Sequence, residues 1–67
     1  MASGMTPEDN NLLNRIFVNL EEAVRSTNQA VALANAGDKN GATSALTKSA
    51  TALNTAKKLI PLVAISR

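Results

Sequence analysis

The segment AGDKNG, Ala36–Gly41, decides the fold of this chain. It interrupts a helix-favouring sequence with residues that end one helix and begin another. Gly37 suits the left-handed conformation that follows a helix, and Asp38 or Asn40 suits the cap of the next one. Because so short a connection joins two amphipathic segments, the two helices must lie antiparallel as neighbours. The sequence therefore predicts an all-α fold, an antiparallel two-helix hairpin.

The first helix is expected from about residue 7 to residue 36. Thr6 suits the N-cap, Pro7 suits the first helical position, and Asp9 completes a variant of the capping box with Thr6. Downstream, apolar and small residues recur at intervals of three and four, so they share a face that is expected to contact a partner. These residues are Leu13, Ile16, Phe17, Leu20, Ala23, Val24, Thr27, Ala30, Val31 and Ala34.

The second helix, expected from about residue 39 to residue 60, carries two sets of residues spaced seven apart. The sets are Leu46, Leu53 and Ile60, which are aliphatic, and Ala42, Ser49, Ala56 and Val63, which are mostly small. Both are typical of a coiled coil, in which small residues let the helix axes approach closely. Folding the hairpin about its turn brings Thr27 to Ser49 as one polar layer. This layer is either a small polar pair that the contact merely tolerates, or a buried polar pair that fixes the helix register by disfavouring shifted pairings.

Charge is divided unequally between the two helices. Residues 1–38 carry two basic and five acidic side chains, and residues 39–67 carry five basic and none acidic. The predicted hairpin places Glu21 and Glu22 about one turn from Lys57 and Lys58, and the acids of the first helical turn near Arg67. Ion pairing within the hairpin is therefore expected to account for the asymmetry.

The closing segment KKLIPLVAISR, residues 57–67, gathers large aliphatic residues around Pro61. Because proline lacks an amide hydrogen and pushes against the preceding turn, the second helix must kink or end there. If the helix continues, Val63 stays in contact with the first helix, but Leu59, Leu62 and Ile65 then point elsewhere. One hairpin cannot bury an end that is apolar on nearly all sides, so the tail is expected to dock on another subunit.

Composition indicates that a single hairpin is only marginally stable. The apolar fraction of 45% is largely alanine and the aromatic share is 1%, so each buried residue removes little apolar surface from water. Below about 70–80 residues, a core rarely supplies more than about 3–5 kcal/mol without a disulfide, a metal or a partner. The absence of cysteine and histidine excludes disulfides and the usual zinc sites.

We therefore predict a homo-oligomer, most simply a dimer that forms a four-helix bundle, or a higher helical oligomer. The predicted oligomer interface is Leu13, Ile16, Phe17, Leu20, Leu46, Leu53, Ile60, Leu62, Val63 and Ile65.

The available side chains exclude most catalytic chemistry. Histidine, cysteine and tyrosine are all missing, and the five carboxylates occupy capping, exposed or loop positions, so no enzyme, metal site or cofactor is expected. The predicted function is instead that of a small interaction or structural protein. Its partner is a second copy of itself, and another protein is a further candidate.

The lysine-rich second helix supports one alternative, binding of nucleic acid or another anionic ligand through a basic surface. Candidate anion-binding residues are Lys48, Lys57, Lys58 and Arg67, with Arg15 and Arg25 on the first helix. Nucleic acid is the less favoured partner, because only Phe17 could stack on bases and it belongs to the apolar stripe.

A single domain is expected at residues 6–67, after a disordered lead-in at residues 1–5. Within it, the turn occupies residues 37–41 and the apolar tail residues 62–67. The chain begins without the basic and apolar run of a secretory signal, and no segment reaches the ~18–20 apolar residues of a membrane span. A cytoplasmic location is therefore expected. Size and composition suit an adaptor, a structural subunit, or an accessory protein of a phage or mobile element.

Overall fold

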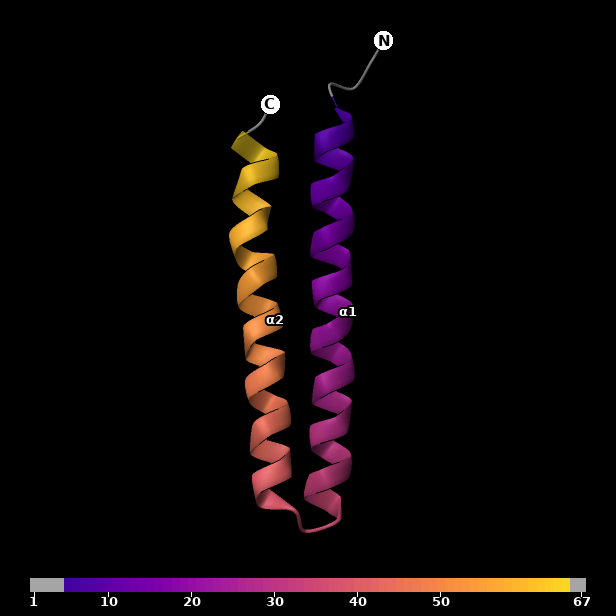
Figure 1. Cartoon of the computed structure of the whole chain (residues 1–67), viewed down its shortest axis with the longest axis vertical. Coiled ribbons are helices and arrows are strands. Elements are labelled where there is room, and N and C mark those ends of the chain that lie inside the picture. Colours follow the sequence, from indigo (N-terminus) through magenta and orange to yellow (C-terminus); the bar gives the residue numbers. More distant parts are fainter. Residues whose placement is uncertain (1–4, 66–67) are drawn as a thin grey trace.

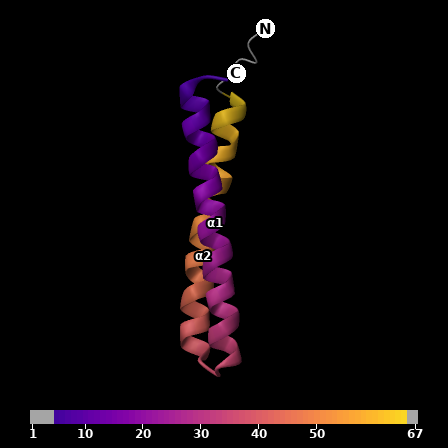
Figure 2. The same ribbon diagram turned by 90° about the vertical axis from the view of Figure 1, so that its right-hand side faces the viewer.

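The structure, a computed structural model, describes the backbone of residues 5–65 and the side chains of residues 5–63. It contains two helices, α1 (Pro7–Asn35) and α2 (Lys39–Ile65). Figures 1 and 2 show the two helices side by side and antiparallel, with the turn at one end and the start of α1 beside the end of α2 at the other. The all-α hairpin predicted from the turn is therefore confirmed.

The start of α1 is fixed by the predicted capping box. The Thr6 hydroxyl accepts a hydrogen bond from the Asp9 backbone amide at 3.1 Å, and the Asp9 carboxylate accepts one from the Thr6 amide at 3.2 Å. Pro7 occupies the first turn of α1, where its missing N–H costs no helical hydrogen bond. These contacts satisfy amide groups that the start of a helix leaves without intrahelical partners.

The turn uses Gly37 and Asp38 as the sequence predicts. Gly37 has a φ of +81°, the left-handed region that glycine adopts without steric cost. Its amide donates to the Ala34 carbonyl at 3.0 Å, and the Asp38 amide donates to the Leu33 carbonyl at 2.9 Å, which closes α1. The Asp38 carboxylate then accepts from the Gly41 amide at 2.9 Å, which caps α2.

Pro61 lies inside α2, which continues to Ile65 rather than ending at the proline. The residues on either side of Pro61 explain why the helix continues. Leu59 is buried in a cluster with residues of both helices, and Val63 packs against the same cluster. The expectation that Leu59 points away from α1 is therefore wrong. Its burial supports the turn before the proline, and Val63 supports the turn after it.

The contact between the helices, here called the seam, is built mainly from small residues. Of the eight hydrophobic side chains buried within the described part of the chain, six are alanines, and only Ile16 and Leu59 are larger. Small side chains at successive intervals of three and four residues let the two helix axes run close together. The seam consists of Leu12, Ile16, Asn19, Ala23, Ser26, Ala30 and Leu33 of α1 and Ala42, Ala45, Ser49, Ala52, Ala56, Leu59 and Val63 of α2.

The predicted polar layer is present at the seam. The hydroxyl oxygens of Thr27 and Ser49 lie 2.8 Å apart, across the two helices. Both hydroxyls also lie within hydrogen-bond distance of the Ala23 carbonyl, Thr27 at 2.8 Å and Ser49 at 3.1 Å. One hydroxyl can therefore donate to the other while the second donates to the Ala23 carbonyl, so each of the three oxygens has a hydrogen-bond partner.

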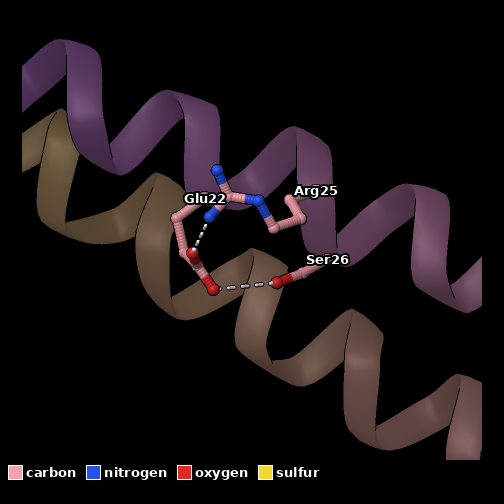
Figure 3. Close-up of polar contacts among 3 residues, drawn as sticks. All are labelled: Glu22, Arg25 and Ser26. Atoms are coloured by element: carbon pink, nitrogen blue, oxygen red, sulfur yellow. Dashed lines mark hydrogen bonds and ion pairs between the residues drawn. The ribbon is translucent and has the colours of Figure 1, made fainter.

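The predicted ion pairs of Glu21 and Glu22 with Lys57 and Lys58 do not form among the described residues. Glu22 instead binds its own helix: Arg25 contacts its carboxylate at 3.0 Å, and Ser26 donates to it at 3.4 Å (Figure 3). Among the described residues, no ion pair joins α1 to α2. Glu21 lies two residues from each of the seam residues Asn19 and Ala23, which places it on the opposite side of α1 from them, so it points away from α2. Arg67 lies outside the described residues. Pairing of Glu21 and Glu22 with lysines of α2 therefore does not account for the charge asymmetry.

Candidate functional site

Large apolar side chains cover one side of the hairpin instead of filling its interior. The stripe that the sequence predicts on the first helix divides into two sets, because only its Ile16, Ala23 and Ala30 enter the seam. The remaining large residues are exposed, and Phe17, for example, is 59% exposed. We call the exposed set the apolar face. It consists of Leu13, Phe17, Leu20, Val24 and Val31 of α1 and Leu46, Leu53 and Ile60 of α2.

These residues belong to one continuous surface. A groove of about 310 Å³ is walled by Leu20 and Val24 on α1 and by Leu53 on α2, and the small seam residues Ala23 and Ser49 also line it. Residues seven apart along a helix point in nearly the same direction. Leu13 therefore aligns with Leu20, Phe17 and Val31 align with Val24, and Leu46 and Ile60 align with Leu53, so the apolar side chains continue along the same side of both helices.

The opposite side of the hairpin is polar. It has a groove lined by Asn19, Glu22, Thr47, Lys48, Thr51, Ala52 and Thr55, which we call the polar face. The threonine hydroxyls here are used within α2: Thr51 donates to the Thr47 carbonyl and Thr55 to the Thr51 carbonyl, each at 3.0 Å. The hairpin is therefore amphipathic as a unit, with one apolar and one polar side.

Six of the ten predicted interface residues lie on the apolar face: Leu13, Phe17, Leu20, Leu46, Leu53 and Ile60. Two others are used inside the hairpin, since Ile16 is buried in the seam and Val63 packs against it. Leu62 is exposed, but it lies seven residues after Thr55 and so belongs to the polar side. The Ile65 side chain lies outside the described residues.

Val24 and Val31 are not among the predicted interface residues. Both are more than half exposed on the apolar face. The signal that would have included them is their spacing, because they follow Phe17 at intervals of seven residues. A period of three and four residues does not distinguish alanine from valine, so it does not separate the seam from the exposed face.

The candidate anion-binding residues do not converge. Lys48 lines the polar face, whereas Lys57 and Lys58 follow nine and ten residues later, about 14–15 Å further along α2. Arg25 is paired with Glu22, and Arg67 lies outside the described residues. The described lysines therefore form no single basic cluster.

The described part of the chain contains no group of three or more His, Cys, Asp or Glu side chains that could hold a metal ion. Neither helix, within the same residues, is both long and apolar enough to cross a membrane.

The fold and its surface define a small two-helix hairpin protein with an alanine-rich seam and an exposed apolar face. No protein-family model, curated protein or solved structure matches the chain.

Proposed function

We propose that this chain is a small non-enzymatic interaction or structural protein that binds a second copy of itself through the apolar face and forms a four-helix bundle. The observation that carries the proposal is the distribution of side-chain size. The seam buries mostly alanine, whereas eight Leu, Val, Ile and Phe side chains remain exposed on one side. A contiguous apolar surface of this extent marks an interaction site.

The accessible surface of the hairpin is larger than that of a compact monomer, by about the area that a dimer interface buries. The chain has an accessible surface of 5011 Å², whereas a compact monomer of 7.0 kDa exposes about 4000 Å². Its radius of gyration is 15.6 Å, compared with about 11 Å for a compact chain of this length. The excess of about 1000 Å² resembles the roughly 800 Å² that each partner buries in a standard protein interface.

The positions of the two contact surfaces around α1 fit four helices. At about 100° per residue, the seam direction set by Ala23 and Ser26 differs by about 110° from the direction set by Leu20 and Val24. A helix in a square bundle contacts two neighbours about 90° apart. Packing one apolar face on another therefore gives each helix a second neighbour and closes the bundle with two chains.

Thermal unfolding at several concentrations tests this proposal. If the folded form is a dimer, raising the protein concentration from a few micromolar to several hundred micromolar shifts the equilibrium toward it, and the melting temperature rises. The unfolding curve is followed by far-ultraviolet circular dichroism, which reports helix content. A fully helical protein whose melting temperature is the same across this range would contradict the proposal.

The competing hypothesis is anion or nucleic-acid binding through α2. The structure adds no support to it, because Lys48 is about 14 Å from the nearest of the other two candidate lysines along the helix. Such binding would weaken steeply as salt is added. A mobility-shift titration at low salt with single-stranded and duplex nucleic acid separates it from self-association.

A further inference from the structure

We propose that, in the self-associated form, α1 of each copy packs against α2 of the other, and that Glu21 of one copy pairs with Lys57 of its partner. The four helices then alternate around the bundle, and both turns lie at the same end. This inference rests on the proposed self-association and adds the arrangement of the two copies.

The net charges of the helices favour this arrangement. α1 carries four acidic and two basic residues, a net charge of −2, and α2 carries four lysines and no acidic residue, a net charge of +4. Among the described residues no ion pair within the chain joins α1 to α2. Packing α1 against α2 of the partner brings opposite charges together at the new contact. Packing α2 against α2 would instead bring lysines together.

Glu21 and Lys57 occupy corresponding edges of the apolar face. Glu21 lines the surface groove that contains Phe17, Leu20 and Val24. Lys57 lies four residues after Leu53 and three residues before Ile60, so it neighbours both on the helix surface. Both side chains therefore lie at the rim of the contact between two apolar faces.

The two residues also lie at nearly the same level along the bundle. Thr27 and Ser49 are level, because their hydroxyls lie 2.8 Å apart. Glu21, six residues before Thr27, is therefore level with Thr55, six residues after Ser49. Lys57 is two residues beyond Thr55, a rise of about 3 Å. When two copies are related by a two-fold axis along the bundle, equal levels meet, and a lysine side chain spans this offset.

A charge-exchange experiment tests the arrangement. The dimer dissociation constant is measured by sedimentation velocity at low salt for the wild type, Glu21→Lys, Lys57→Glu and the double variant. Each single variant replaces attraction by repulsion at two symmetric rim sites, so we expect the dissociation constant to rise about 5–30-fold. The double variant restores the pair in reversed orientation, and we expect its dissociation constant to return to within about threefold of the wild-type value.

The matched control is the double variant Glu21→Lys with Lys48→Glu, which has the same net charge as the exchanged pair. Lys48 lies on the polar face, so its reversal is expected to restore nothing. Recovery only in the variant that combines Glu21→Lys and Lys57→Glu supports the arrangement. If the two double variants bind equally well while the wild type is a dimer, the arrangement is wrong and self-association stands. A monomeric wild type overturns both proposals.

Discussion

A pair of valine substitutions distinguishes an interface from an ordinary exposed residue. Val24 and Val18 lie on the same helix and are 61% and 58% exposed. Val24 lines the groove of the apolar face, whereas Val18 lies six residues earlier and points to a different side of α1. Both positions are in the helix interior, so the difference in helix propensity between valine and aspartate is the same for Val24→Asp and Val18→Asp.

The loss of dimer stability expected for Val24→Asp follows from the burial of the Val24 side chain in the proposed interface. Burying the exposed part of this valine is worth about 1–2 kcal/mol, given about 1.5–3 kcal/mol for complete burial of such a side chain. Enclosing a polar group without a partner costs about 1–3 kcal/mol more. The dimer contains the change twice, so it loses about 4 kcal/mol or more, and its dissociation constant rises about a thousandfold. Val18→Asp, as an ordinary surface change, costs about 0.5 kcal/mol or less per copy.

Sedimentation velocity over a dilution series measures both dissociation constants, and circular dichroism at the same concentrations reports helix content. We expect the Val24→Asp protein to become monomeric and to lose helix, and the Val18→Asp protein to stay close to the wild type. Equal behaviour of the two variants would refute the assignment of the apolar face as the interface, whether both dissociate or neither does.

Two further predictions concern the hairpin itself. Gly37→Ala should lower the free energy of unfolding by about 1–2 kcal/mol, because alanine is strained at a φ of +81°, and Gly37→Asn should lose less; equal chemical-denaturation midpoints for all three proteins would contradict this. Thr27→Val and Ser49→Ala should be non-additive by at least about 0.5 kcal/mol in a double-mutant cycle, because their hydroxyls contact each other and share one carbonyl. Strict additivity of the two unfolding free energies would show that the pair is energetically independent.

The parts of the fold that depend on a few neighbouring residues could be predicted from the sequence. The capping residues of α1, the glycine that closes it and the aspartate that caps α2 each act through contacts within five residues. The pairing of residues across the two helices was also predictable. A short turn between two helices places Thr27 opposite Ser49, and their hydroxyls are in contact.

The division of apolar residues between seam and surface could not be predicted in the same way. A helical period of three and four identifies alanine and leucine alike as apolar, but the side-chain sizes on both helices together determine how closely the axes approach. Small residues of both helices fill the seam around Ala23, and Leu20 and Leu53 stay exposed beside it. Glu22 does not pair with a lysine of α2 because its carboxylate contacts Arg25 on its own helix.

Sedimentation equilibrium of the wild-type chain at tens to hundreds of micromolar measures its mass in solution directly. Self-association through the apolar face predicts a species of about 14 kDa, twice the 7.0 kDa of one chain, that dissociates with loss of helix on dilution. A fully helical species of 7.0 kDa throughout this range would contradict the proposal that the exposed leucine, valine, isoleucine and phenylalanine side chains bind a second copy.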